Sequence, residues 1–511
     1  MRGPHNIIRL IRTGATLERT GAMAVVMDAL DAPPLVRTTL RCLTWPFKWL
    51  GAKGDPDMPP APRALTALGP AYIKFGQILS TRPDLVGGEL AAQMRVLQDK
   101  LPPFPVAVAK ASIEAELGAP VEAIFDDFSP SVAAASIAQV HKARLKETGE
   151  AVAIKVLRPG IERAFRVDID AFYFAANVIE LLSASSRRLR PTDVIAHFEG
   201  VVLGELDLRL EAASASEFAA NTENDKGMQL PSIKWDLSGK RVMTMQWADG
   251  VPLGDNNAID AAGHDRILLG DRVLQLFLSH ALRDGYFHAD MHQGNLKVAP
   301  NGNIIIYDFG IMGHIDEYTR RVYAEILYGF IKRDYRRVAE VHFEAGYVPP
   351  DRDVDEFARA LRAVGEPIFG MDASRISMGN LLSYLFEVTE RFGMETRTEL
   401  ILLQRTMVVV EGVARSLNQQ INIWQVAKPV VEDYIREALG PRAVAQSLGK
   451  TLAVLARFGP RLPQLVETAI MRSAAPAASE VPRRRRRDLA LWGVGGLALG
   501  AAIARAAMHL S

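Results

Sequence analysis

The chain has 511 residues, of which 49% are hydrophobic and 23% are charged, so it is long enough for several domains and too apolar for general disorder. Its net charge is +1, but residues 483–487 are five consecutive arginines, which leaves −4 for the remainder and argues against a nucleic-acid-binding protein. The single cysteine, Cys42, excludes an intramolecular disulfide and is typical of a reducing compartment.

The first 110 residues predict two helical regions. Residues 1–60 alternate apolar runs with prolines and glycines, which predicts short helices and loops, and they lack the apolar stretch of a secretory signal. Residues 61–110 follow as a second region. In it, apolar positions at helical spacing between Pro70 and Ser80 predict one helix, and residues 88–98 predict another before a proline-rich stretch.

The next region, residues 111–247, mixes strand and helix patterns. Residues 138–145 and 152–157 alternate apolar and polar side chains around a turn, which predicts a β-hairpin. Helical patterns occupy residues 161–183 and 193–220, and residues 241–247 predict a further strand. We expect this region to form the smaller lobe of the protein.

Residues 248–345 predict a second lobe, and residues 346–471 a C-terminal helical region. A helix over residues 266–285 ends at Gly285, and a later hairpin turns at residues 300–303 before a strand over 304–307. The pattern from residue 315 to 470 is almost wholly helical, and no internal repeat interrupts it.

The end of the chain predicts a membrane anchor. Residues 472–487 form a polar and then arginine-rich linker, and residues 489–504 contain no charge. A helix over residues 488–510 is marginal for a span, which takes about 17–25 apolar residues. The arginines would keep that end cytoplasmic and attract anionic headgroups. The alternative is a Gly/Ala-rich helix that packs on the protein itself.

The most specific functional pattern joins His-Ala-Asp-Met-His-Gln-Gly-Asn at residues 288–295 to Asp-Phe-Gly at residues 308–310. Phosphoryl transfer from ATP needs a carboxylate near the attacking oxygen and oxygen ligands for magnesium. Asp290 is the candidate for the first role, and Asn295 and Asp308 are candidate Mg²⁺ ligands. The order and spacing match the catalytic loop and metal motif of kinases.

Two other interpretations of residues 288–295 are a plain polar loop and a transition-metal cluster of His288, Asp290 and His292. Neither accounts for Asn295 or for the Asp-Phe-Gly sequence that follows. The kinase-like interpretation explains both and is therefore preferred.

Lys155, in Val-Ala-Ile-Lys at residues 152–155, matches the strand lysine that contacts nucleotide phosphates in kinases. Its predicted ion-pair partner is Glu211. Asp207 and Glu211 are four residues apart, so within one helix they would share a face. The alternative for these carboxylates is a solvated acidic helix surface.

Two departures from kinases narrow the expected activity. Alanines stand at Ala133, Ala134 and Ala135, where a glycine-rich phosphate loop is expected, so the phosphate cradle should be altered because a Cβ restricts close approach. After Gly310 the chain enters a helical pattern without an Ala-Pro-Glu element or a long activation segment. This argues against ordinary protein phosphorylation.

Together these motifs resemble the UbiB family, the atypical kinase-like proteins of ubiquinone biosynthesis, over about residues 60–420. Lys74-Phe-Gly-Gln77 matches the family's KxGQ element, residues 133–136 its alanine-rich loop, and Glu205-Leu-Asp207 its ExD element. The resemblance implies a helix-rich α+β, protein-kinase-like two-lobed fold with an N-terminal helical extension and a C-terminal transmembrane helix.

The resemblance also implies roles for individual residues. The KxGQ helix is expected to fold over the active site, where Lys74 contacts Glu205; from the residues alone, Lys74 and Gln77 would be a surface pair. Met291 and Gln293 stand where the family often has prolines, and Gln246 where its hinge is usually acidic. The expected nucleotide-binding residues are Gln77, Ala133, Ala134, Ala135, Ser136, Lys155, Met245 and Trp247.

The function that the resemblance implies is an atypical kinase or ATPase that uses ATP and Mg²⁺ and supports ubiquinone biosynthesis at the inner membrane, with its catalytic part in the cytoplasm. Expected partners are ATP and ADP, isoprenoid quinone precursors or lipids, the membrane and other ubiquinone-biosynthesis proteins, but not nucleic acid. The alternatives are a small-molecule or lipid kinase, and a nucleotide-sensing scaffold that presents lipids without phosphotransfer. No flavin fingerprint supports the family's older name, a hydroxylase.

Overall fold

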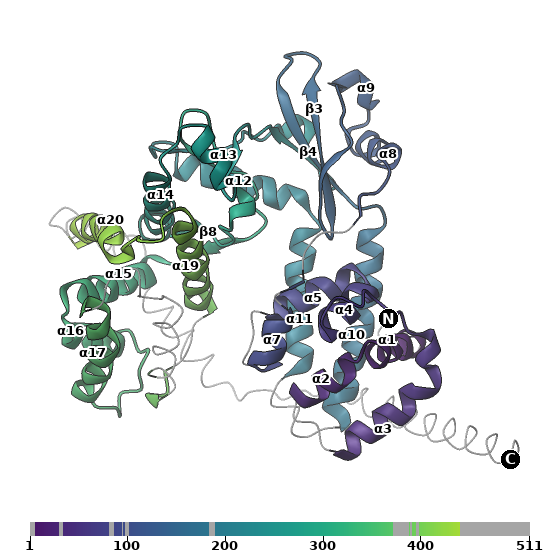
Figure 1. The fold of residues 1–511 in the computed structure, drawn as a ribbon, viewed down its shortest axis with the longest axis horizontal. Coiled ribbons are helices and arrows are strands. Elements are labelled where there is room, and N and C mark those ends of the chain that lie inside the picture. The colour runs from purple at the N-terminus through teal and green to yellow at the C-terminus, as the bar shows by residue number, and fades with distance from the viewer. Residues whose placement is uncertain are drawn as a thin grey trace, which may run out of the picture. The chain divides into compact units, whose positions relative to one another are not determined.

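A computed structural model describes residues 6–29, 34–80, 86–94, 96–97, 102–182, 190–370, 388, 391–394 and 398–439. The chain divides into a compact unit from Met1 to Arg436 and a second unit from Glu437 to Ser511. The first unit combines two antiparallel sheets and one mixed sheet, in which β5 and β10 are parallel, with many helices (Figure 1). The helix-rich α+β class predicted from the sequence is therefore confirmed.

The N-terminal region consists of short helices, as predicted, and their bounds are α1 Ile7–Thr20, α2 Ala22–Ala29, α3 Pro34–Thr44, the 3-10 helix η2 Trp45–Leu50, α4 Pro60–Leu68, α5 Pro70–Ser80 and α7 Gly88–Met94. Helix α1 ends at Gly21, whose φ of 82° is a left-handed conformation that glycine adopts without strain. Helix α7 ends at Met94, four residues before the predicted end of the second helix.

Helix α5 packs against the two long helices α10, Ile161–Leu182, and α11, Pro191–Glu205. The ring of Phe75 lies 5.1 Å from Phe172 of α10 and 5.2 Å from Phe198 of α11. The hydroxyl of Tyr72 is hydrogen-bonded to Thr13 of α1 at 2.7 Å. Aromatic packing and one polar contact thus fix the helix that carries Lys74.

The smaller lobe contains a five-stranded antiparallel sheet in the order β1-β3-β4-β6, with β2 also paired to β3. The strands are β1 Phe125–Asp126, β2 Ser131–Ala134, β3 Ala138–Leu145, β4 Ala151–Leu157 and β6 Val242–Gln246. The predicted hairpin is confirmed, with Ala138 opposite Leu157 and Val140 opposite Lys155. Helices α8, Val106–Leu117, and α9, Val121–Ile124, contribute Ile113 and Val121 to the core beneath this sheet.

The predicted helix over residues 193–220 is wrong in one respect, because the structure divides it into α11 and α12, Leu208–Asn221. Asp207 lies at the break and caps α12, and its carboxylate accepts a hydrogen bond from the backbone N–H of Arg209 at 3.2 Å. Aspartate favours such capping positions over helix interiors. Asp207 therefore does not share a helix face with Glu211, contrary to the prediction.

The second lobe combines short strands with helices around the largest buried core. The elements of this lobe are β5 Met228–Gln229, β7 Val251–Pro252, α13 Asn256–Ala261, α14 Arg266–Ser279, the π-helix η5 His280–Asp284, β8 Tyr286–His288, η6 Gln293–Asn295, β9 Leu296–Val298, β10 Ile304–Ile306 and β11 Met312–His314. The 3-10 helix η4, Trp235–Leu237, belongs to the smaller lobe, where Leu237 packs against the core beneath the sheet. Gly285 ends the helical run, as predicted, with a φ of 67°. The hairpin at residues 300–303 joins β9 to β10.

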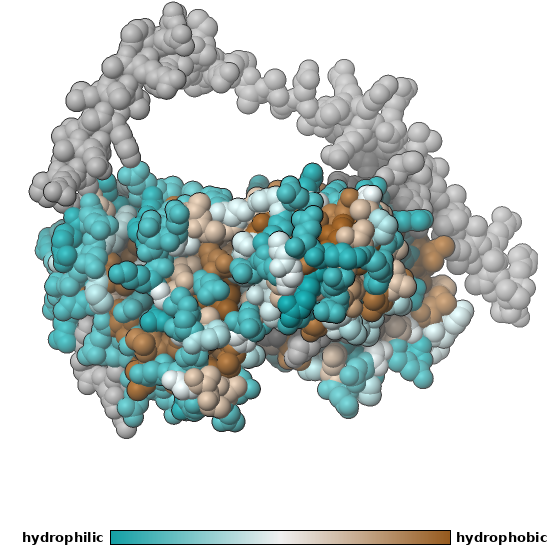
Figure 2. Space-filling model, turned by 90° about the horizontal axis from the view of Figure 1, so that it is seen from above, coloured by the Kyte–Doolittle hydropathy of each residue, from teal (hydrophilic) through white to brown (hydrophobic). Residues whose placement is uncertain are grey.

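The remaining described elements are helices, as predicted: α15 Glu317–Lys332, α16 Tyr335–Glu344, α17 Val354–Gly370, α19 Thr398–Leu417 and α20 Ile423–Leu439. Among the described residues, no helix combines the length and apolarity that crossing a bilayer requires. The predicted anchor over residues 488–510 lies outside the described residues. On the face seen in Figure 2, hydrophobic and hydrophilic residues intermix, as is normal for a protein surface.

Candidate active site

The centre of the candidate site is an ion pair between strand β4 and helix α12. The Nζ atom of Lys155 lies 2.7 and 2.8 Å from the two carboxylate oxygens of Glu211, and 3.8 Å from Oδ1 of Asp308. Lys155 and Glu211 are largely buried, whereas the side chain of Asp308 is 42% exposed. The structure thus forms the ion pair predicted from the sequence and places the Asp-Phe-Gly aspartate beside it.

The charges in this cluster stabilise one another. Burial disfavours the charged ammonium of Lys155, but the carboxylates of Asp308 and Glu211 outweigh burial and hold its pKa above the ordinary value. Burial raises the pKa of Asp308, but Lys155 and the backbone N–H of Gly310 outweigh it, so the pKa lies below the ordinary value. Asp308 is therefore ionised at neutral pH, as a metal ligand must be.

A second ion pair lies close to the first. The Nζ atom of Lys74, on α5, lies 2.9 Å from Oε1 of Glu205 at the end of α11, and both side chains are largely buried. Lys74 helps to lower the pKa of Asp308, and Glu205 helps to raise that of Lys155. The two pairs therefore share one electrostatic environment. The predicted contact between Lys74 and Glu205 is present.

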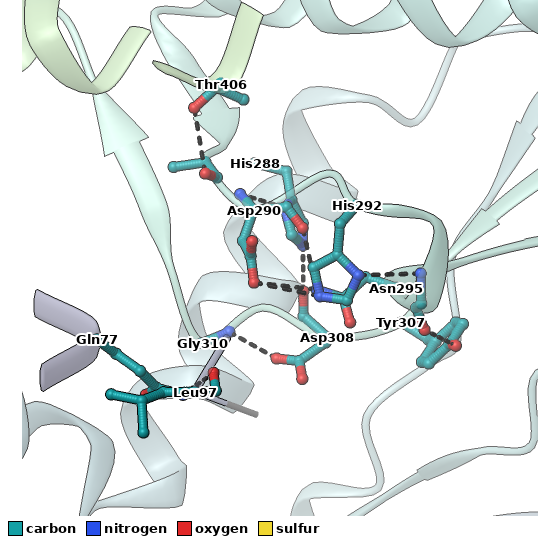
Figure 3. A network of polar contacts seen from close by, with 12 residues as sticks. Gln77, Leu97, His288, Asp290, His292, Asn295, Tyr307, Asp308, Gly310 and Thr406 are labelled. Atoms are coloured by element: carbon teal, nitrogen blue, oxygen red, sulfur yellow. Dashed lines mark hydrogen bonds and ion pairs between the residues drawn. The ribbon is translucent and has the colours of Figure 1, made fainter. Parts of the chain in front are cut away.

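The loop between β8 and β9 holds the predicted catalytic residues in one hydrogen-bonded turn (Figure 3). The amide nitrogen of Asn295 donates to the backbone oxygen of Asp290 at 3.0 Å and lies 3.3 Å from its carboxylate. His292 lies 3.5 Å from the same carboxylate. These contacts orient Asp290 and Asn295 toward each other.

His288 couples this loop to the Asp-Phe-Gly segment. Its Nδ1 accepts a hydrogen bond from the backbone N–H of Asp290 at 3.1 Å, and its Nε2 is bonded to the backbone oxygen of Asp308 (Figure 3). Burial lowers the pKa of His288, which favours the neutral ring that these two bonds require. Phe309 is buried against His288 and Phe218 of α12, at 5.8 Å from each ring.

The donor atoms present fit a magnesium ion bound together with nucleotide phosphates. Since the amide nitrogen of Asn295 is committed to Asp290, its carbonyl oxygen is the atom that remains for a metal, beside the carboxylate of Asp308. Magnesium prefers oxygen ligands and is usually held by one or two side chains plus phosphates. Among the described residues, no three His, Cys, Asp or Glu side chains gather as a metal-binding group.

The alanine-rich loop forms a tight turn between β2 and β3. The backbone N–H of Ala135 donates to the oxygen of Ala138 at 2.8 Å, and Ser136 is buried. The guanidinium of Arg158 donates to the oxygen of Ala135 at 3.0 and 2.9 Å. The turn that follows Ala133 and Ala134 of β2 is therefore held by Arg158, which directly follows β4 and lies three residues beyond Lys155.

The remaining predicted nucleotide contacts occupy different surroundings. Met245 is buried in the sheet, opposite Ala153 of β4. The Trp247 ring lies 4.6 Å from Nζ of Lys142 and 4.9 Å from Nζ of Lys297, a pair of cation–π contacts at the junction of the lobes. Gln77 donates to the backbone oxygen of Leu97 at 3.4 Å, and no structural observation links it to a nucleotide.

Several residues that support the site were not anticipated. Thr406 of α19 is buried and donates to the backbone oxygen of Ala289 at 3.1 Å. Gln293 donates to Ser416 of the same helix at 2.5 Å. These contacts join the catalytic loop to a helix more than a hundred residues away in the sequence, so no local pattern could reveal them. Arg158 could have been recognised from the sequence, because it directly follows the strand that contains Lys155.

Comparisons with known proteins agree with this geometry. The ABC1 atypical kinase-like domain matches residues 96–342, and the UbiB helical domain matches residues 361–422. A protein named "Probable protein kinase UbiB" from Marinobacter nauticus is 40% identical over 426 residues, which cover 82% of this chain and 78% of that protein. The chain belongs to the UbiB family.

Further matches to a relative and to a solved structure also extend over most of the chain. A protein of the same name from Shewanella pealeana is 39% identical over 467 residues, covering 90% of this chain and 85% of that one. The solved complex of Rv3197 with erythromycin from Mycobacterium tuberculosis has a TM-score of 0.50 and 26% identity, and the match covers 70% of this chain and 90% of that one. The predicted resemblance to the family and the kinase-like fold are therefore confirmed.

Proposed function

We propose that this protein binds ATP with Mg²⁺ and hydrolyses it as an atypical, kinase-like ATPase that supports ubiquinone biosynthesis. The observation that carries the proposal is the position of Lys155, which lies 2.7 Å from Glu211 and 3.8 Å from Asp308. Asp290 and Asn295 form the facing hydrogen-bonded turn. This set provides both a cation for phosphates and oxygen ligands for a metal.

Each side chain has a distinct role in this proposal. Lys155 contacts the nucleotide phosphates, and Glu211 holds the lysine in place. Asn295 and Asp308 hold magnesium, which when bound neutralises negative charge on the phosphates. Asp290 orients the attacking hydroxyl or water and accepts its proton. The turn at Ala135 replaces the glycine-rich cover of the phosphates.

The acceptor in this proposal is water or a small hydroxyl compound. Strand β11 and helix α15 follow Gly310 directly, so the segment that binds peptide substrates in kinases has no counterpart there. The ion pair of Lys74 and Glu205 lies beside the site and restricts it further. The same observations favour a lipid or small-molecule kinase as the second candidate.

The cellular part of the proposal rests on the family and on the end of the chain. Membership of the UbiB family supports a role in ubiquinone biosynthesis. In our proposal the protein acts there on isoprenoid quinone precursors or lipids, together with other proteins of that synthesis. The uncharged residues 489–504, preceded by five arginines, support a single-pass anchor in the inner membrane with the catalytic part in the cytoplasm.

Asp308→Asn tests the site and the pathway together. Because the variant loses one charged metal ligand, we expect Mg-ATP affinity to fall by about 2 kcal/mol, or roughly 30-fold, and cellular ubiquinone to fall with it. Calorimetric titration and quinone profiling measure the two effects. Normal ubiquinone together with lost nucleotide binding would contradict the proposal.

Asp290→Asn separates the candidate functions, because it keeps the metal ligands and removes the proton acceptor. If this variant binds ATP, does not hydrolyse it and still restores ubiquinone, the protein is a nucleotide-sensing scaffold. With the normal protein, γ-labelled ATP distinguishes the others. Label recovered as free phosphate supports an ATPase, and label recovered in a lipid extract supports a lipid kinase.

A further inference from the structure

Four large apolar side chains lie exposed on one short turn of the N-terminal region. Trp45 and Trp49 are 70% and 73% exposed, and Phe47 and Leu50 are 39% and 41% exposed. All four belong to η2, whose sequence is Trp-Pro-Phe-Lys-Trp-Leu and in which no residue is buried. We call these four residues the tryptophan patch. Single exposed apolar residues are normal, but four within six positions mark an interaction surface.

The patch is fixed to helix α1 through its backbone. A Cβ atom added to Gly51, directly after η2, would lie 2.4 Å from the backbone oxygen of Ala15, so the two backbones are in direct contact. Arg19 donates to the oxygen of Gly51 at 2.7 Å, and the N–H of Ala52 donates to Thr16 at 3.1 Å. The turn is therefore rigidly mounted and presents its side chains outward.

The stretch of sequence that carries the patch is basic, and two exposed aspartates, Asp55 and Asp57, follow it. Residues 34–54 contain Arg37, Arg41, Lys48 and Lys53 and no aspartate or glutamate. Lys48 lies within the patch and is exposed, as is Lys53, while Arg37 pairs with Asp28 of α2. Tryptophan concentrates at the membrane–water interface, and basic side chains beside it attract anionic lipid headgroups.

We propose that the tryptophan patch inserts into the headgroup region of an anionic lipid bilayer. A single six-residue turn is too small for a stable protein interface, which takes about 800 Å² from each partner. The ammonium of Lys48 would also lose its hydration at the centre of such an interface, where lysine is depleted. At a bilayer surface the lipid phosphates solvate it instead.

This contact is separate from the proposed anchor at the end of the chain and has a structural consequence. Helix α1, which supports the patch, is also bonded to Tyr72 of α5 through Thr13 and to Asp168 of α10 through Arg9, at 2.7 and 2.6 Å. The bilayer contact thus orients the helix that carries Lys74 relative to the membrane.

The only cysteine of the chain provides the probe. Cys42 is exposed on α3, three residues before Trp45, so an environment-sensitive fluorophore such as NBD can be attached to the full-length protein at this one site. We expect its emission to shift to the blue on addition of vesicles of phosphatidylglycerol and phosphatidylcholine, and to be quenched by spin-labelled lipid. Phosphatidylcholine vesicles alone, or high salt, should give a weaker response.

The matched variants are Trp45→Ser/Trp49→Ser and, as a control, Trp235→Ser on η4, whose side chain is 49% exposed. The double variant should lose most of the spectral shift and of the quenching, and the control should keep both. Since all three tryptophans are exposed, thermal unfolding should be unchanged, which separates a lost contact from misfolding.

Three outcomes would overturn the inference. The first is an unchanged shift in the double variant. The second is a blue-shifted probe without vesicles that depends on protein concentration, which identifies a second copy as the occupant. The third is a blue shift without vesicles that is independent of concentration, which identifies another segment of this chain. Because the probe reports depth near α3, neither the anchor nor ATP turnover determines the result.

Discussion

Two regions of this protein bury titratable side chains in opposite ways. In the candidate active site, Lys155 keeps its charge because Glu211 and Asp308 lie beside it. In the helical cluster of α16 and α17, His342 is buried among aromatic rings, with Phe357 at 5.3 Å. Burial there lowers the pKa of His342 to about 4, so the ring is neutral at pH 7.

This difference in charge distinguishes a candidate catalytic group from a buried side chain that serves packing. Burying a charge costs several kcal/mol unless a partner compensates, so a buried lysine that keeps its charge beside two carboxylates is a candidate for function. A buried histidine without charge requires only a hydrogen bond, which His342 makes from Nδ1 to the backbone of Val338 at 2.7 Å. Removing the charge of Lys155 should therefore destabilise the protein, whereas at His342 it is the gain of a charge on protonation that should destabilise it.

The largest expected effect comes from Lys155→Met. The change leaves the carboxylate of Glu211 buried without its partner, which typically costs about 3–5 kcal/mol of stability. It also removes the cation that contacts the phosphates in our proposal. We expect a clearly lower melting temperature and loss of measurable Mg-ATP binding, checked by thermal unfolding and by titration calorimetry.

The double variant Lys155→Met/Glu211→Leu separates these two effects. Because it removes both buried charges, most of the lost stability should return, since apolar replacements of a buried pair are often neutral. Nucleotide binding should not return. A double variant that regains ATP binding would show that Lys155 has no role in holding the phosphates.

A smaller effect is expected from His342→Phe, and it depends on pH. The unfolded histidine binds a proton below about pH 6.5, whereas the folded one does so only below about pH 4. In this window the unfolded state binds more protons, so the free energy of unfolding falls as the pH drops. The loss amounts to about 3 kcal/mol.

The variant has no proton to bind at this position and should lose about 3 kcal/mol less than the normal chain between pH 6.5 and pH 4. Denaturant unfolding at several pH values measures this difference. His314→Phe, at an exposed position on β11, is the matched control for the introduction of a phenylalanine. Parallel curves for the normal chain and His342→Phe would contradict the low pKa.

The first region was largely predictable from the sequence, because its signals are local. The alternation of residues 138–145 and 152–157 places Lys155 on a strand, and the fixed spacing from Asp290 to Asn295 needs only one turn of chain. Even so, the prediction that placed Asp207 within a continuous helix was wrong. The side chain of Asp207 caps the N-terminus of α12, and helical periodicity alone does not predict where such a cap divides a helix.

Contacts between distant segments were not predictable. Thr406 lies 117 residues from Ala289 and Ser416 lies 123 residues from Gln293, and each contact depends on how α19 packs against the catalytic loop. The exposed tryptophans lie close together in the sequence, but no sequence pattern predicted that they would be exposed. Their exposure depends on the contact between the backbone of Gly51 and helix α1, which periodicity does not predict. Tertiary packing determined these features.

The smallest predicted effect tests the link between the catalytic loop and helix α19. Gln293, one of the two positions where the family often has proline, donates to Ser416 of α19 at 2.5 Å. This bond can hold the catalytic loop in place of a proline's fixed backbone angle. Gln293→Ala should therefore lower the rate of ATP hydrolysis several-fold, equivalent to about 1 kcal/mol, with little change in Mg-ATP affinity.

A double-mutant cycle with Ser416→Ala shows whether the bond itself is responsible. If it is, the two single variants and the double variant lose similar activity, because either change alone already breaks the contact. Additive losses would mean that the two side chains act independently. If the bond is responsible, Gln293→Pro should keep the rate of ATP hydrolysis near normal, because the fixed backbone angle of proline holds the loop instead. A proline variant as slow as Gln293→Ala would show that rigidity at this position does not limit turnover.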